Sequence, residues 1–272
     1  MPELPEVEIT RRGLTPLIGQ TVKQVIIRHA GMRWPIPKHL ESTLPGQRLQ
    51  KLGRRAKYIL ANFDTGTLLL HLGMSGRICL LACDSPPEKH DHFDLLFDSG
   101  RVMRLRDPRR FGAVLWAGEH PETHPLIAAL GPEPLSDAFD AAYLHAQLAS
   151  RNTAIKLAIM DSHLVVGVGN IYASESLFRA GIHPQTPARK LSPQQCGELV
   201  ITIKQTLQDA LAAGGSSLRD FFGADGNPGY FQQTYFVYGR AGEPCRACGS
   251  AIRNIRLGQR STFFCECCQQ AS

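Results

Sequence analysis

Four cysteines near the end of this 272-residue chain restrict its folding more than any other feature. Cys245 and Cys248 have two residues between them, as do Cys265 and Cys268, and 16 residues separate the pairs. Two close pairs at this spacing are typical of a structural zinc site with four thiolate ligands. Cys267 could replace Cys265 or Cys268, but the two-residue gap favours Cys268. We therefore expect one structural Zn²⁺ ion, with Cys267 as a spare thiol.

The segment between the cysteine pairs predicts a β-hairpin. Its expected strands are 252–257 and 261–265, with residues 258–260 at the tip. The segment contains no acidic residue, so the hairpin can present positive charge to phosphates. A basic face that is merely solvated would have the same composition. The arginines concerned are Arg253, Arg256 and Arg260.

Composition places the whole chain among globular proteins outside the membrane. Hydrophobic residues make up 43% and charged residues 20%, which excludes wholesale disorder. The longest apolar runs, such as 164–168, are far shorter than the ~18–20 residues that span a bilayer. The acidic N-terminus does not resemble a signal peptide, so we expect a cytoplasmic protein. The formal net charge of +6 weakly favours a polyanionic partner.

The N-terminal half predicts one helix followed by many strands. Apolar residues recur at spacings of three and four over 3–15, which indicates a helix. Short strands separated by turn signals then extend to residue 116, and this arrangement is typical of a β-sandwich or barrel. The expected strands are 22–28, 57–63, 67–72, 77–81, 92–97, 101–105 and 113–116.

A helical period begins after residues 131–134, the best linker candidate. Ser192 and Gln195 predict a capping box for a helix that ends at residues 214–215. A Gly-rich turn precedes another expected helix, 171–180, and such a turn can offer backbone N–H groups to phosphate. Residues 214–232 are also Gly-rich and indicate a mobile loop.

The N-terminus can supply an unusual nucleophile. Pro2 is small enough that removal of Met1 is expected, which would leave a secondary amine beside Glu3 and Glu6. An α-amino group has a pKa near ~8 and lysine near ~10.4, so the former supplies on the order of several hundred times more neutral amine at pH 7. A secondary amine that attacks the anomeric carbon of a sugar forms a cationic iminium. On Pro2 alone, a proline that merely starts a helix is the simpler interpretation.

Motifs along the whole chain, in order, resemble the formamidopyrimidine-DNA glycosylase family. The N-terminal PELPEVE resembles the signature of that family, and so does the closing zinc hairpin with Arg260. The resemblance implies a bacterial enzyme that excises oxidised purines from damaged double-stranded DNA. The motifs between the two ends are RAKY at 55–58, HLGMSG at 71–76, HDH at 90–92, DPRRFG at 107–112 and GVGNIYA at 167–173.

The resemblance also implies an α+β fold with three parts. A catalytic β-sandwich domain with an N-terminal helix is expected over 1–131. A DNA-binding domain with a helix–two-turn–helix is expected over 132–236, and a four-cysteine zinc finger with a β-hairpin over 237–272. The strands and helices indicated by periodicity agree with this division. The family implies a monomer that associates with the nucleoid through DNA.

Five residues match the catalytic positions of the family. Pro2 resembles the nucleophile that attacks C1′ and forms a Schiff base, and Glu3 the acid that protonates the opening sugar. Glu6 resembles a supporting carboxylate. Lys57 resembles the general acid that serves β-elimination. Arg260 resembles the hairpin residue that grips phosphate and assists δ-elimination.

Further residues match positions that hold DNA. Met74, Arg109 and Phe111 resemble the side chains that fill the void left by an extruded base, although Met74 and Phe111 taken singly would be read as core residues. Asn170 could instead cap a helix, and Lys156 could be only a solvated lysine. The remaining expected DNA-binding residues are His71, His90, Arg151, Lys156 and Asn170.

Two alternatives compete with this interpretation. The sister enzyme that acts on oxidised pyrimidines typically opens PEGPE and lacks the void-filling set, so Leu4, Met74 and Phe111 argue against it. A non-catalytic zinc-ribbon protein would need neither an amine at position 2 nor Lys57. The aspartates that accompany the motifs are expected to be structural anchors rather than catalytic acids; they are Asp91, Asp94 and Asp107.

Overall fold

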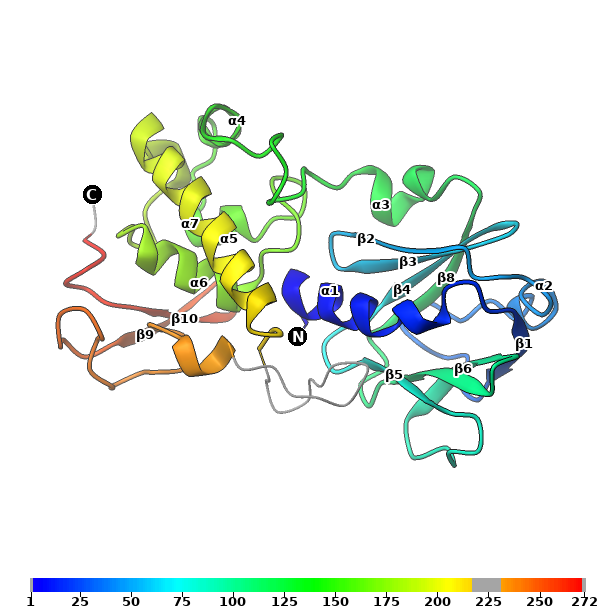
Figure 1. Ribbon diagram of the computed structural model, residues 1–272. Coiled ribbons are helices and arrows are strands. Elements are labelled where there is room, and N and C mark those ends of the chain that lie inside the picture. The colour runs from blue at the N-terminus through cyan, green and yellow to red at the C-terminus, as the bar shows by residue number, and fades with distance from the viewer. Residues whose placement is uncertain (1, 217–230, 271–272) are drawn as a thin grey trace. The chain divides into compact units, whose positions relative to one another are not determined.

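The computed structural model describes residues 2–216 and 231–270 and contains two compact units (Figure 1). The first unit comprises Met1–Ala128 with Ala213–Tyr230, and the second Ala129–Ala212 with Phe231–Ser272. The second unit contains both the central helices and the zinc hairpin. The predicted boundary between them at residue 237 stays a prediction. The loop expected at 214–232 falls largely on residues 217–230, outside the described residues.

The first unit is the expected β-sandwich. One sheet has the order β1-β6-β7-β5 and the other β2-β3-β4-β8, and neighbouring strands are antiparallel. Buried side chains of both sheets, such as Leu70 and Leu95, belong to one hydrophobic core. The strands are β1 (Val22–Ile27), β2 (Lys51–Arg55), β3 (Tyr58–Phe63), β4 (Gly66–His71), β5 (Arg77–Ala82), β6 (Asp91–Phe97), β7 (Arg101–Arg106) and β8 (Ala113–Gly118).

Strand β2 is the strand that the sequence prediction missed. Three of its five residues are charged and one is glycine, so it carries no apolar alternation, and only Leu52 is buried. Pairing of Arg55 with Tyr58 leaves two residues, Ala56 and Lys57, as the turn between β2 and β3. The prediction that Lys57 opens a strand is therefore wrong, because this lysine lies at the tip of a hairpin.

Helix α1 (Leu4–Gly13) begins with the expected polar N-terminus. The backbone N–H of Glu3 donates to the Glu6 carboxylate over 2.9 Å, which satisfies one of the donors that a helix start leaves unpaired. Arg11 and Arg12 occupy the last turn, where positive charge favours the helix dipole. Leu4 and Val7 are buried. The sandwich thereby holds the start of α1, and Pro2 before it, in a fixed place.

The second unit is helical, and its longest helix confirms the predicted capping box. The Ser192 N–H donates to Gln195 Oε1 over 3.0 Å, and the Gln195 N–H donates to Ser192 Oγ over 3.2 Å. Helices α4 and α5 were not predicted, because they are too short to show a clear period. The helices of this unit are α4 (Ala141–Leu148), α5 (Ile155–Ile159), α6 (Asn170–Arg179) and α7 (Pro193–Ala212).

Short helical turns complete the fold. Two belong to the sandwich as four-residue α-helices, and the others are 3₁₀ turns. Among the described residues, no helix is long and apolar enough to span a bilayer. The turns are α2 (Leu40–Thr43), α3 (Pro125–Ala128), η1 (Thr15–Leu17), η2 (Pro121–Thr123), η3 (Ala188–Lys190) and η4 (Phe231–Thr234).

The C-terminal hairpin consists of β9 (Arg253–Leu257) and β10 (Arg260–Phe264). Arg260 pairs with Leu257, so the turn is Gly258-Gln259 and Arg260 begins a strand instead of forming part of the tip. Both turn residues have positive φ, as a two-residue hairpin turn with right-handed strand twist requires. A Cβ at Gly258 would lie 2.7 Å from the Leu157 side chain, so the turn packs closely against α5.

Candidate functional site

Glu6 holds the start of helix α1. Pro2 and Glu3 are buried at the start of α1. One Glu6 carboxylate oxygen accepts the Glu3 N–H, and the other accepts the Ser216 N–H over 2.9 Å. Glu6 is itself 2% exposed. A carboxylate bonded in this way orients the N-terminus, in keeping with the supporting role expected for Glu6.

His71 lies next to the Lys57 turn. Its neighbour across the sheet is Tyr58, whose ring centroid is 4.8 Å away. His71 Nδ1 accepts the Gly73 N–H over 3.0 Å, which assigns the proton of the neutral ring to Nε2. Burial, with the charges of Lys57 and Arg33, lowers the pKa of His71 to about 4. His71 is therefore a neutral N–H donor at pH 7, in the apolar strand where the sequence put it.

This neutral histidine makes the first unit sensitive to acid. The pKa is about 6.5 when unfolded and about 4 when folded, so the unfolded chain takes up the proton first as the pH falls. Through this group the free energy of unfolding falls by ~2 kcal/mol between pH 7 and pH 5. Replacing His71 by Asn, which keeps an acceptor for Gly73, should abolish this part of the decrease. Urea unfolding followed by tryptophan fluorescence measures it, since Trp34 and Trp116 both lie in this unit. Equal losses in wild type and variant would contradict the prediction.

Met74, Arg109 and Phe111 come from two adjoining loops of the first unit. The Arg109 guanidinium lies 4.9 Å from the centre of the Phe111 ring, and Phe111 is 40% exposed. Met74 is half-buried. The reading of Phe111 as a core residue is therefore wrong. A Cβ at Gly73, whose φ is +63°, would lie 2.4 Å from the Phe111 backbone, so the two loops interlock.

Asp107 ties these loops together, which confirms that it is a structural anchor. Its carboxylate accepts from Ser75 Oγ over 2.9 Å and from the Gly112 N–H over 2.8 Å. The Asp107 N–H donates to the carbonyl of His90, a half-buried residue with a φ of +75°. The loops that carry the void-filling side chains are thus bonded to the Asp107 carboxylate, and His90 is bonded to the backbone of the same residue.

The other two aspartates are anchors as well. Asp94 forms a buried pair with Arg104 over 2.9 Å, and Asp91 bonds Arg106 over 2.6 Å. Both pairs lie between β6 and β7. Buried acids paired in this way hold strands together and are not available as proton donors.

In the second unit, Lys156 joins α5 to the hairpin. The lysine is fully buried, and its Nζ donates to Asn170 Oδ1 over 2.7 Å, to the Ser261 carbonyl over 3.1 Å and to Thr262 Oγ1 over 2.7 Å. The interpretation of Lys156 as a solvated lysine is therefore wrong. The hydrogen bonds of the Lys156 ammonium described above go to acceptors within the protein. Direct contact of Lys156 with DNA stays a prediction.

Asn170 belongs to the same network. Its Nδ2 donates to the Ser261 carbonyl over 3.0 Å. The helix cap is Gly169, and Asn170 is the first residue of α6, so the alternative that Asn170 caps the helix is wrong. The side chain thus reaches the hairpin from the first turn of α6, and its contact with phosphate stays a prediction.

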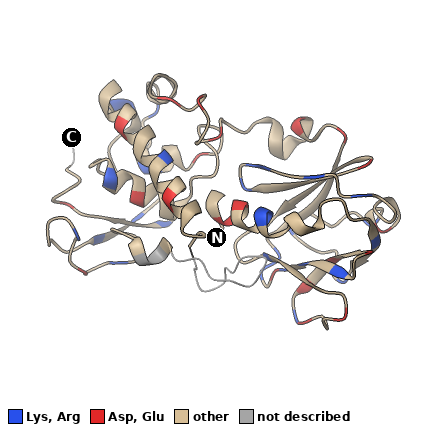
Figure 2. Cartoon of the chain, viewed as in Figure 1, with Lys and Arg blue, Asp and Glu red and all other residues tan. Residues whose placement is uncertain are grey.

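Two arginines expected to bind DNA, Arg151 and Arg260, lie at the surface of the second unit. Arg151 bonds Asp161 over 2.8 Å and keeps about a third of its side chain exposed. Burial raises the pKa of Asp161, but bonds from Arg151 and His163 outweigh it and lower that pKa to about 2. Arg260 is exposed at the start of β10, and Figure 2 marks the Lys and Arg positions of the chain in blue.

Glu175 is a structural residue that sequence reasoning missed. It lies within α6, and its carboxylate accepts the N–H groups of Phe236, Val237 and Tyr238 over 2.8, 3.0 and 2.8 Å. Burial raises the pKa of this carboxyl although those bonds favour its charged form. The acid fixes the segment that enters the zinc finger. An acidic residue on the buried face of a helix was the available signal.

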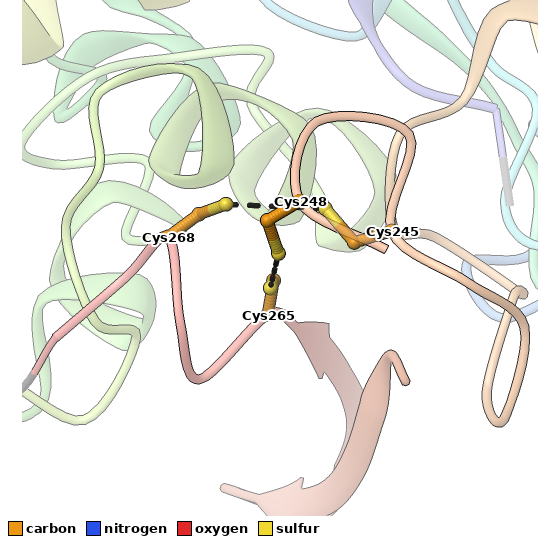
Figure 3. A group of neighbouring side chains, drawn as sticks. All are labelled: Cys245, Cys248, Cys265 and Cys268. Carbon is orange, nitrogen blue, oxygen red and sulfur yellow. Dashed lines mark hydrogen bonds between the residues drawn. The ribbon is translucent and has the colours of Figure 1, made fainter. Parts of the chain in front are cut away.

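The four expected cysteines converge on one point (Figure 3). All four Sγ atoms lie within 4.8 Å of one another. The separations are 3.5 Å for Cys248–Cys265 and 3.9 Å for Cys245–Cys268. A tetrahedral zinc with bonds of ~2.3 Å places its sulfurs roughly 3.8 Å apart, so the set fits the ion. Cys267 is exposed and outside the group, which confirms the choice of Cys268.

Comparison with known proteins identifies the family. The formamidopyrimidine-DNA glycosylase N-terminal domain matches residues 1–114, the H2TH domain of the same family 130–222, and the zinc finger found in FPG and IleRS 242–271. A formamidopyrimidine-DNA glycosylase of Methylobacillus flagellatus is 69% identical over 99% of this chain and 97% of its own length. The chain belongs to the formamidopyrimidine-DNA glycosylase family.

Solved glycosylases of this family have the same fold. The Thermus thermophilus protein is 38% identical and superposes with a TM-score of 0.90, with complete coverage of both chains. The Lactococcus lactis protein, solved with DNA containing Fapy-dG, is 34% identical with a TM-score of 0.92 and covers 99% of this chain and 100% of its own. The predicted α+β architecture and the structural zinc are thereby confirmed. The chain is a DNA glycosylase of base excision repair, and AP lyase activity is typical of its family.

Proposed function

We propose that this glycosylase excises 8-oxoguanine and formamidopyrimidines from duplex DNA and then cleaves the strand by β,δ-elimination. The observation that carries the proposal is Pro2, buried beside Glu3 at the start of a helix whose orientation Glu6 fixes. The void-filling loops with Met74 and Phe111 favour purine lesions over the pyrimidine substrates of the sister enzyme. The zinc-ribbon alternative leaves the buried N-terminus without a purpose.

The chemistry follows from the nature of these groups. The Pro2 amine attacks C1′, the bond to the damaged base breaks, and Glu3 gives a proton to the sugar oxygen as the ring opens. The resulting iminium makes the C2′ proton acidic. Loss of that proton breaks the bond to the 3′ oxygen, which Lys57 protonates as general acid. Loss of the C4′ proton then breaks the bond between C5′ and its oxygen and releases the 5′ phosphate, and Arg260 assists this second elimination.

DNA must open before this chemistry can begin. Extruding a stacked base costs a few kcal/mol. We assign Met74, Arg109 and Phe111 to the space that the extruded base leaves in the duplex. There the thioether of Met74, the guanidinium of Arg109 and the ring of Phe111 replace the lost stacking and pairing. We assign His71, His90 and Arg151 to the phosphates. Bound zinc supplies a structural cross-link that holds the hairpin and takes no part in the reaction.

Borohydride trapping tests the proposal, because it reduces an iminium to a stable amine. Protein and an 8-oxoguanine:C duplex should give a covalent adduct that an undamaged duplex does not give. A duplex with an oxidised pyrimidine should react more slowly. Faster trapping on the pyrimidine lesion would favour the sister activity. Absence of an adduct on either damaged duplex would leave a binding protein.

Removal of Arg260 should weaken the grip on DNA. Each phosphate contact contributes a slope of about −0.9 to the dependence of log K on log salt. Arg260→Ala should therefore flatten the slope by about one and weaken binding similarly for every sequence. Fluorescence anisotropy over a salt series measures it. Arg12→Ala, at an exposed arginine of α1 that pairs with Glu8 over 2.9 Å, is the control and should keep the slope. An unchanged slope in Arg260→Ala would remove Arg260 from the interface.

We also propose that the enzyme acts as a monomer in the cytoplasm, where DNA binding associates it with the nucleoid. A single active site with its own nucleophile and zinc finger requires no second copy. Light scattering of the free protein and of its complex with one duplex would reveal a dimer if this is wrong.

A further inference from the structure

Glu8 contacts arginines from two elements of the first unit. Arg11, one turn later in α1, bonds Glu8 through Nε over 3.0 Å and Nη2 over 2.8 Å. Arg54, from strand β2, approaches Glu8 Oε2 with its Nε at 3.4 Å. The side chains of Glu8 and Arg54 are each 14% exposed. A pair so shielded from solvent is screened less than a surface pair, so Glu8 connects α1 to β2.

The other end of the Arg54 guanidinium holds a turn. Its Nη1 donates to the carbonyl of Ala56 over 2.8 Å. Ala56 has a φ of +53°, a left-handed conformation that is unfavourable for a residue with a Cβ. A charged donor on its carbonyl is a strong bond that can offset this cost. The turn that Arg54 holds is the one that presents Lys57.

We propose that Arg54 is a positioning residue that fixes the Lys57 turn relative to helix α1, and so sets Lys57 against the carbon to which Pro2 is bonded. The inference rests on the proposed function, because it concerns the elimination step of that reaction. One guanidinium spans both elements: Nε faces the helix through Glu8, and Nη1 faces the turn through Ala56.

A second bond supports the same arrangement. Arg11 Nη1 donates to the carbonyl of Leu52 in β2 over 3.2 Å, so the helix grips the strand on both sides of Gly53. Burial raises the pKa of Glu8, but the bonds from Arg11 and Arg12 outweigh it and keep this pKa below its usual range. Glu8 is therefore charged at neutral pH and can hold both arginines.

Loss of Arg54 should affect the elimination step and not the formation of the iminium. Formation of the iminium requires Pro2 and Glu3, which Glu6 orients without Arg54. Elimination requires Lys57 as well, and a general acid displaced by about 1 Å can lose on the order of 100-fold in rate. Loss of Arg54 should thus slow strand cleavage while the iminium still forms.

The test uses a duplex with an abasic site, so that base excision does not limit either measurement. The variant Arg54→Met keeps the length of the side chain and removes both contacts. We expect its rate of borohydride trapping to stay within about threefold of wild type, and its rate of strand cleavage to fall by about 30-fold or more.

Arg12→Met is the matched control. Arg12 also bonds Glu8, over 2.9 Å, but it is 54% exposed and lies within α1. Trapping and cleavage should both be unchanged in this variant. If Arg54→Met does not fold, as judged by thermal melting, Glu8→Gln replaces it and should show the same selectivity to a smaller degree.

Other outcomes overturn the inference. Equal losses of trapping and cleavage in a folded Arg54→Met protein would assign Arg54 to general stability. Unchanged cleavage would show that the Lys57 turn keeps its conformation without Arg54. Failure of the wild-type protein to form any adduct would instead refute the proposed function. The two failures are therefore distinguishable.

Discussion

A chain that keeps one residue ahead of Pro2 is expected to lose base excision and strand cleavage together, by about a thousandfold or more. The extra residue turns the Pro2 nitrogen into an amide, whose electron pair is delocalised into the carbonyl and cannot attack C1′. DNA binding should change little, since the void-filling loops and the hairpin are untouched. Single-turnover cleavage of an 8-oxoguanine duplex, with mass spectrometry of the N-terminus, measures the effect.

Two proteins provide the controls. Pro2→Gly with a free amine should still give a trapped adduct, at a reduced rate, because a primary amine also forms an imine. The same variant with a retained preceding residue should give none. A fully active enzyme that carries an intact initiator methionine would contradict the mechanism.

Local signals explain what the sequence could predict. The cysteine pairs, the Ser192–Gln195 capping box and most strands depend on residues within a few positions of each other, so spacing and alternation reveal them. Strand β2 fails this rule because its charged residues hide any alternation, and it forms through pairing with β3. The error moved Lys57 from a hairpin tip into a strand.

Long-range contacts explain most of what could not be predicted. Lys156 was expected at the surface or at DNA, and its acceptors Ser261 and Thr262 lie more than 100 residues away in the chain. Glu175 likewise bonds a segment 61–63 residues later. A pattern within a window of residues cannot reveal such partners, and a buried lysine or glutamate has the same letter as an exposed one.

The zinc site should be as indispensable for DNA binding as Pro2 is for chemistry. A single two-stranded hairpin is at best marginally stable in water, and zinc contributes on the order of 10 kcal/mol to the folding of such segments. Replacing the buried Cys265 by Ser, or removing zinc with a chelator, should weaken binding of a damaged duplex by about 100-fold or more and abolish strand cleavage. Anisotropy and a zinc-release assay measure the two effects.

Cys267 supplies the matched control for this loss. It is exposed and lies beside the ligands without joining them, so Cys267→Ser should retain one zinc per chain and full affinity. Zinc loss in Cys267→Ser with retention in Cys268→Ser would show that the ligand assignment is wrong. Tryptophan fluorescence should stay native in all these variants, because Trp34 and Trp116 both lie in the sandwich unit.

The loss of zinc is expected to destabilise more than the hairpin, because Lys156 connects the hairpin to helix α5. When β10 is disordered, the buried ammonium loses two of its acceptors, the Ser261 carbonyl and the Thr262 hydroxyl. A buried charge that loses acceptors is destabilising by roughly several kcal/mol. The helical unit should therefore melt at a lower temperature without zinc, and Lys156→Met should shrink this difference. An equal decrease of the melting temperature in both proteins would show that the hairpin and α5 are not coupled through Lys156.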